Sequence, residues 1–198
     1  MKNITIIIIT IMICISCKSQ TINIKTWDGT KTNGAYYKDV DNELNQFEGT
    51  YKYVNGNNEL TMVFKKHINF YMFPYSEDLL AGEIKYKKDG VTLFDNLNKI
   101  NQNLTNKYLH DICGNSLITN TVRPICEDCL PNQFRARLIF FGRSNNDIGG
   151  SVFLQKFTEG GQEKMKVLIL YGERSYQDGE PILSPLIPWG YYVLTKIP

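Results

Sequence analysis

Apolar and polar residues alternate along most of the chain after residue 47. Each such segment has one apolar and one polar face, which is typical of an antiparallel β-sheet with one buried face. The alternating segments are residues 51–54, 60–65, 80–87, 91–97, 137–141, 151–157, 165–171 and 190–197. Turn sequences, Asn55 with Gly56 and Asp89 with Gly90, separate the early ones. No helical period persists over a comparable length. We therefore expect an all-β fold, a single antiparallel meander of about eight strands that closes into a barrel or a sandwich.

The first seventeen residues combine a basic start with a short apolar run. Lys2 precedes residues 4–16, which are mostly isoleucine. The run is shorter than the roughly 20 residues that a membrane-spanning helix needs, so it predicts a secretory signal peptide over residues 1–16. Ser16 followed by Cys17 resembles a bacterial lipobox, which implies cleavage before Cys17 and attachment of lipid, palmitate included, to that residue. Cys14 follows Ile13 and lacks a small predecessor. An ordinary signal peptide or an uncleaved anchor is the alternative.

The remaining chain divides into a tether and one domain. Residues 17–45 are polar and are expected to form the lipidated tether and lead-in, and residues 46–198 the barrel-like domain. A length of 198 residues with 42% apolar residues suits one domain with a real core. Residues 98–135 interrupt the alternation and contain Pro124 and Pro131, so we expect a long cysteine-containing loop there. A formal charge of +2 gives no reason to expect a nucleic-acid partner.

Two resemblances follow from short motifs. Residues 44–53 place an apolar residue, Gly-Thr and an aromatic at the start of the first strand, which resembles the start of lipocalin-like barrels. Residues 17–20, 58–66, 78–86 and 188–196 are similar to a family of uncharacterised secreted lipoproteins, a domain of unknown function, from Bacteroidota-type bacteria. The resemblance implies a lipid-anchored envelope protein and brings no activity. In such bacteria acidic residues after the lipidated cysteine tend to accompany surface export. Residues 18–21 contain none, which implies the periplasm-facing side of the outer membrane.

Three further cysteines lie in the domain: Cys113, Cys126 and Cys129. In an oxidising compartment such thiols form disulfides, and three of them leave one over. We expect Cys113 to pair with Cys126 or Cys129, because a bond between Cys126 and Cys129 would close a tight ring. A tetrahedral zinc site formed by these cysteines and His110 is the alternative.

Motifs of catalysis are scarce. No Gly-x-Ser-x-Gly, His-Glu-x-x-His or phosphate-binding glycine loop occurs in the chain. Glu127 and Asp128 separate the two cysteines of the Cys-x-x-Cys motif, and their charges disfavour the thiolate that redox catalysis needs. His67 follows two lysines and is expected at a solvated strand end, because a general base would need an oriented partner. We expect a non-enzymatic protein without a cofactor.

Aromatic residues make up 12% of the chain and either fill the core or line a cavity. Small barrels are commonly filled by side chains, which favours a filled core. Candidate ligand-lining residues from the first three strands are Tyr51, Tyr53, Met62, Phe64, Ile84 and Tyr86. The main hypothesis is a membrane-tethered protein that binds an apolar ligand or an envelope partner protein. A structural or scaffolding lipoprotein with a filled core is the alternative, and the zinc protein described above is the third.

Overall fold

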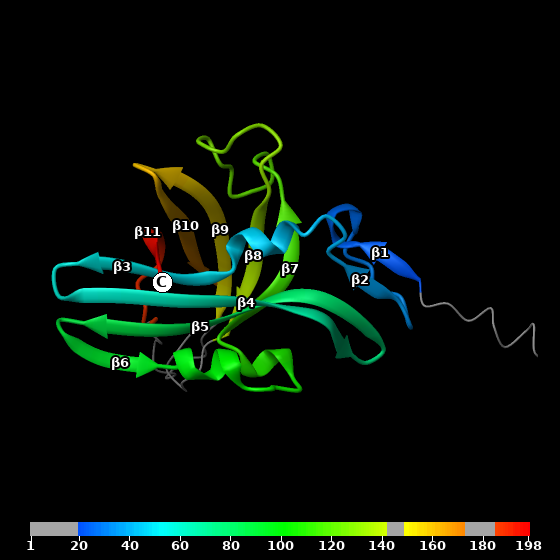
Figure 1. Cartoon of the computed structure of the whole chain (residues 1–198), viewed down its shortest axis with the longest axis horizontal. Helices are drawn as coiled ribbons and strands as arrows, with labels where there is room; N and C mark the ends of the chain where they lie inside the picture. Colours follow the sequence, from blue (N-terminus) through cyan, green and yellow to red (C-terminus); the bar gives the residue numbers. More distant parts are fainter. Residues whose placement is uncertain (1–19, 142–148, 173–184) are drawn as a thin grey trace, which may run out of the picture.

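The computed structural model of the protein describes residues 20–141, 149–172 and 185–198 (Figure 1). The leader and Cys17 lie outside the described residues. The strands are β1 (Thr21–Asn23), β2 (Tyr36–Lys38), β3 (Gly49–Asn55), β4 (Asn58–Met72), β5 (Tyr75–Lys88), β6 (Val91–Asp95), β7 (Ile112–Ile118), β8 (Arg135–Phe140), β9 (Gly150–Glu159), β10 (Gln162–Tyr171) and β11 (Gly190–Ile197). Short 3₁₀ helices are η1 (Ile24–Thr26), η2 (Glu43–Phe47), η3 (Leu97–Asn101) and η4 (Lys107–Leu109). No helix in the described ranges has the length and hydrophobicity to cross a membrane.

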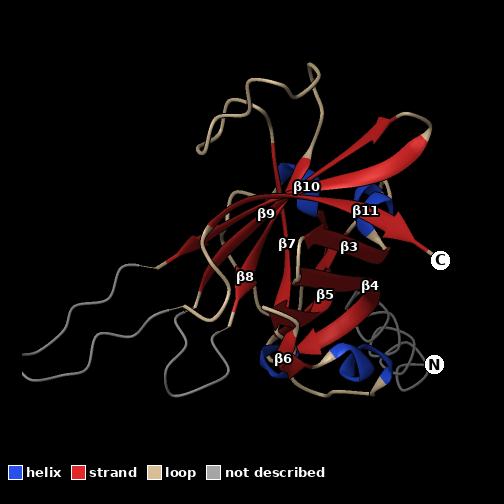
Figure 2. Cartoon of the chain, turned by 90° about the vertical axis from the view of Figure 1, so that its left-hand side faces the viewer, coloured by secondary structure: helices blue, strands red, loops and turns tan. Residues whose placement is uncertain are grey.

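Eight of the described strands form a closed barrel. Strands β3, β4, β5, β7, β8, β9, β10 and β11 follow one another around it, and every neighbouring pair is antiparallel. Figure 2 shows them wrapped around a common interior, with the loop between β7 and β8 projecting above. The all-β expectation is confirmed, and the meander closes as a barrel. The ring closes where β11 meets β3, through Thr195 opposite Lys52, Lys196 opposite Tyr51 and Ile197 opposite Thr50.

Strand β5 has three partners in succession along the edge that does not face β4. Strand β2 pairs with it in parallel at Ser76 and Glu77, β7 at residues 80–82, and β6 at residues 85–88. The long β4–β5 hairpin therefore extends past the barrel towards β1 and β2 (Figure 1). Both faces of β5 are also covered, since its side chains belong to two separate hydrophobic clusters, and residues 77–84 are all buried.

The segment at 98–135 differs from the long loop expected there. It contains η4, most of η3, and strand β7, which pairs with both β5 and β8. Its register shifts between Cys113 and Ser116, where Gly114 and Asn115 break the regular alternation. Because of this irregularity, the alternation of apolar and polar residues does not predict the strand. Its conformation is decided by tertiary pairing with two neighbouring strands. The longest irregular part that remains in this segment is the connection between β7 and β8.

Side chains fill the interior of the barrel. Five of the six candidate ligand-lining residues, all except Tyr53, are at most 5% exposed and belong to one hydrophobic cluster, and Tyr53 packs against it. Gly82 on β5 lies opposite Phe64 on β4. A Cβ atom on Gly82 would lie 2.7 Å from two ring carbons of Phe64, so the ring occupies the space that a side chain would need. These residues thus share the interior and act there as core.

Candidate functional site

A pocket of about 450 Å³ lies on the outer wall of the barrel. Its floor is formed by side chains that point outward from β8, β9, β10 and β11, among them Phe153 and Leu168. These two belong to a small buried cluster with Ile118, separate from the barrel interior. Residues 125–128, from the connection between β7 and β8, close the pocket from above. The pocket therefore lies between a rigid sheet surface and a loop.

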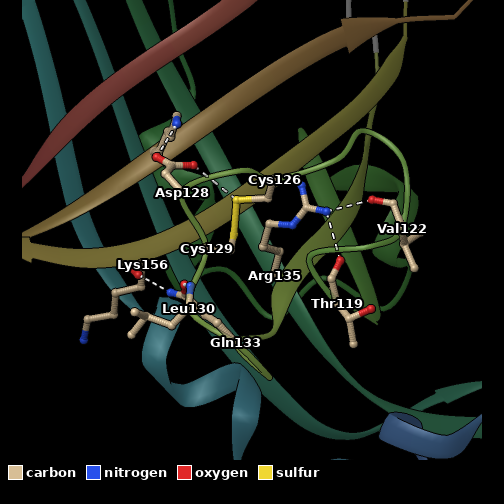
Figure 3. The surroundings of a disulfide bond; sticks show 10 residues. Thr119, Val122, Cys126, Asp128, Cys129, Leu130, Gln133, Arg135 and Lys156 are labelled. Carbon is tan, nitrogen blue, oxygen red and sulfur yellow. Dashed lines mark hydrogen bonds and ion pairs between the residues drawn. A yellow bond between two sulfur atoms is a disulfide. The ribbon is translucent and has the colours of Figure 1, made fainter.

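The loop is closed on itself by a disulfide between Cys126 and Cys129, whose Cα atoms are 5.4 Å apart (Figure 3). That separation lies in the ordinary range for a disulfide, so the turn accommodates the small ring. The expected pairing of Cys113 with either of them was wrong. Cys113 lies in β7 opposite Ala81 of β5 and is buried in a cluster with Leu79. Its position is fixed by the barrel wall, whereas the other two cysteines belong to the loop.

The zinc alternative also fails in this arrangement. Cys126 and Cys129 are bonded to each other. His110 instead directs Nδ1 to Oε1 of Glu83 at 2.6 Å. Among the described residues, no group of three or more histidine, cysteine, aspartate or glutamate side chains is placed to hold a metal ion.

Arg135, the first residue of β8, connects the loop to the sheet. Its Nη2 donates hydrogen bonds to the carbonyl oxygens of Thr119, at 3.0 Å, and Val122, at 2.8 Å (Figure 3). The residue is 5% exposed, and burial lowers the pKa of its guanidinium. Its Nε is buried without a hydrogen-bond partner, and no described carboxylate lies within ion-pair distance. The pocket lining thus includes a buried positive charge whose described hydrogen-bond acceptors are carbonyl groups, with the carboxylate of Asp128 as a more distant negative charge.

Two further contacts hold the other side of the loop. Gln133 donates from Nε2 to the carbonyl oxygen of Lys156 at 2.7 Å and accepts from the backbone N–H of Leu130 at 3.0 Å. Lys166 on β10 forms an ion pair with Asp128 at 2.6 Å, and its ammonium lies 5.3 Å from the ring centre of Tyr191. The hydrogen bond from Lys166 lowers the pKa of Asp128. The loop is therefore attached to the sheet at several points.

A second group of polar side chains lies on the outer side of β5, under η3 and η4. Glu83 and His110 are both fully buried, and the backbone N–H of Asp111 donates to Glu83 at 3.2 Å. Burial, followed by the nearby charge of Glu83, raises the pKa of Asp111 to about 6. His67 was expected at a solvated strand end, but it is half-buried, with its ring 5.4 Å from that of His110. Desolvation lowers the pKa of His67. Because Glu83 and His110 are sealed from solvent, this group offers no surface to a substrate.

Sequence reasoning missed the pocket and most of its polar lining. Arg135, Gln155 and Lys166 alternate with core residues on their strands, and this is also the pattern of ordinary solvent-facing side chains. The burial of Arg135 depends on the loop above it, which no local pattern describes. The one sequence signal near the site was the Cys-x-x-Cys motif.

Comparisons with known proteins give a family but no activity. A family model described as a family of unknown function, DUF6705, matches residues 1–197. No curated protein and no solved structure matches the chain. The expected membership of a family of unknown function agrees with this result.

Proposed function

We propose that this chain, which belongs to the DUF6705 family of unknown function, is a lipid-anchored envelope protein that binds its ligand without catalysis on the outer wall of the barrel. The observation that carries the proposal is the contrast between a filled interior and the pocket of about 450 Å³ beneath the disulfide loop. Pockets of this size commonly hold small molecules or the side chains of a partner. The barrel then acts as a rigid support for the site.

The proposal places the ligand on the outer wall of the barrel and not among the residues that the sequence suggested as its lining. The residues expected to line it, Tyr51 and Met62 among them, pack against one another in the core. A ligand would have to displace these side chains, at a cost of about 1.5–3 kcal/mol for each large apolar side chain exposed. The outer pocket requires no such displacement.

The proposed location depends on the leader and the disulfide. The signal-peptide pattern and the small residue before Cys17 support lipidation, and the acid-free residues 18–21 support the periplasm-facing side of the outer membrane. The Cys126–Cys129 disulfide suits such an oxidising compartment, since cytosolic thiols are kept reduced. A tether that begins at Cys17 would leave the barrel and its pocket on the aqueous side of the membrane.

Native mass spectrometry of the detergent-solubilised full chain tests the binding function. We expect a co-purifying mass on the wild type that is absent from Ile125→Trp, because Ile125 lies at the pocket and a larger side chain there obstructs it. The matched control is Ile68→Trp, at a similarly exposed isoleucine on β4 that is outside the pocket lining. A wild type with nothing bound would instead favour the scaffolding alternative, which the filled interior also suits.

Membrane fractionation tests the anchor. Cys17→Ala is expected to release the protein into the soluble fraction, whereas Cys14→Ala is expected to remain with the membrane. Metabolic labelling with palmitate should follow the same division. A Cys17→Ala protein that stays in the membrane fraction would contradict lipidation at this residue.

A further inference from the structure

The pocket beneath the disulfide loop contains a buried charge, that of Arg135, with no carboxylate of the described residues within ion-pair distance. We infer that it binds an amphipathic anion, with a carboxylate or phosphate group near Arg135 and Lys166 and an apolar body on Phe153 and Leu168. The inference rests on the proposed function and specifies the class of ligand for the same site.

Arg135 supplies the main argument. An arginine that is 5% exposed normally has a carboxylate or phosphate partner, because burying an uncompensated charge is expensive. Two carbonyl oxygens engage Nη2, and Nε has no partner among the described residues. The guanidinium has five N–H donors in a fixed plane, so these two bonds leave donors over. An anion in the adjoining pocket would supply the missing negative charge.

Lys166 adds a second cation on the neighbouring part of the floor. Its ion pair with Asp128 involves a carboxylate side chain that is 60% exposed, so water and salt weaken that pair. Glu127, the other carboxylate of the lining, is also exposed on the loop. The acidic groups therefore belong to the solvated roof, whereas the buried charge is positive. Gln155, which is 6% exposed, adds an amide to the floor.

The apolar part of the ligand follows from the other half of the lining. Phe153 and Leu168 form a buried apolar floor, and Ile125 and Tyr191 are 61% and 63% exposed at the pocket. Large apolar side chains that remain this exposed beside a charged group suit a ligand with an apolar body and an ionic head. An inorganic anion alone would leave this surface in water.

Isothermal titration of the full chain in detergent tests the inference with three eight-carbon probes: octanoate, octyl phosphate and octanol. We expect at least one of the two anions to bind about tenfold or more tightly than octanol, as charged hydrogen bonds commonly provide. The tighter anion identifies the head group as carboxylate or phosphate. Inorganic phosphate alone is expected to bind more weakly than octyl phosphate.

The variants separate a binding role of the cations from a structural one. Arg135→Gln and Lys166→Gln should each weaken anion binding by about tenfold while changing octanol binding little. Lys166→Gln removes the exposed ion pair to Asp128 but leaves the Arg135 and Gln133 bonds to the loop in place, so it tests the charge even if Arg135→Gln displaces the loop. The matched control is Lys52→Gln, at a partly exposed lysine of β3 outside this pocket, which should bind as the wild type does.

The failure of this inference is distinguishable from failure of the proposed function. Equal binding of octanoate, octyl phosphate and octanol, abolished by Ile125→Trp, would overturn the anion while leaving the pocket as a binding site. Anion binding that survives both Arg135→Gln and Lys166→Gln would also overturn it. Absence of binding by any probe would refute the ligand class, and the native mass spectrum would then decide whether the pocket holds something else.

Discussion

Gly82→Ala tests whether the interior of the barrel is as full as the proposed function requires. The added Cβ would lie 2.7 Å from Cδ1 and Cε1 of Phe64 and 3.4 Å from Cβ of Ile112. Carbon atoms prefer about 3.5–4.0 Å, so the Phe64 ring would have to move by about 1 Å. Phe64 is 2% exposed, and its ring contacts that of Tyr51, which is fully buried. The ring therefore has nowhere to go without moving other core residues.

The expected loss of stability follows from two opposing effects. Overpacking of this kind costs about 1–3 kcal/mol. Replacing glycine by alanine restricts the unfolded chain and returns about 0.4–1 kcal/mol. We expect a net loss of about 1–2 kcal/mol in the free energy of unfolding, measured by urea denaturation with intrinsic tryptophan fluorescence. For a chain of this size that lowers Tm by about 2–8 °C.

A second variant identifies the cause of that loss. In a Phe64→Leu background the clash is relieved, so Gly82→Ala should cost much less there than in the wild type. Equal costs in the two backgrounds would show that the Phe64 ring is not the obstacle. A Gly82→Ala protein as stable as the wild type would show spare room inside the barrel, and the argument that places the ligand outside would lose its basis.

Three other changes test the charged groups and the loop. Glu77, which is 1% exposed, accepts hydrogen bonds from Lys107 and Lys31, so Glu77→Gln should cost about 3 kcal/mol in urea denaturation, whereas Glu159→Gln at an exposed carboxylate should cost little. Because the pKa of Asp111 is raised to about 6, the folded state holds a proton on this carboxyl between about pH 4 and 6, where the unfolded state has released it. The stability it contributes is fully present below about pH 4 and is lost as the pH rises towards and through 6; Asp111→Asn should flatten this slope, and an unchanged slope would exclude Asp111 as its source. Replacing Cys126 and Cys129 together by serine should cost about 2 kcal/mol at most, because the ring they close is short, and denaturation of the wild type with and without reductant gives an independent comparison.

The sequence predicted the strands in which apolar and polar residues alternate and missed a strand whose alternation is interrupted. Residues 60–65 and 80–87 alternate clearly, and both lie in barrel strands where predicted. Strand β7 was missed because Gly114 and Asn115 interrupt its pattern and because its conformation depends on pairing with β5 and β8. Local periodicity does not record such long-range pairing.

The candidate site was less predictable than the fold. Cys126 and Cys129 were recognised as disulfide candidates, but their pairing was wrong because ring size was weighed without knowing that Cys113 belongs to the barrel wall. Glu83 occupies a polar position in the alternating pattern of β5, and this pattern alone predicts a solvent-facing carboxylate. Glu83 is buried because the segment after β6 folds back over the outer face of β5, and the local pattern does not record this contact.

The contact between β3 and β11 imposes a time order on the assembly of the barrel. One of these strands begins at Gly49 and the other at Gly190, so the first cannot acquire its second neighbour until the chain has been synthesised beyond residue 190. Before then β3 and β10 each present an unpaired edge, which is a template for association with other chains. A chain that stops before residue 190 would carry both edges permanently. The pairing of β11 therefore covers the edge of β10 along residues 164–169 and that of β3 along residues 50–52, and removes both from association with another molecule there.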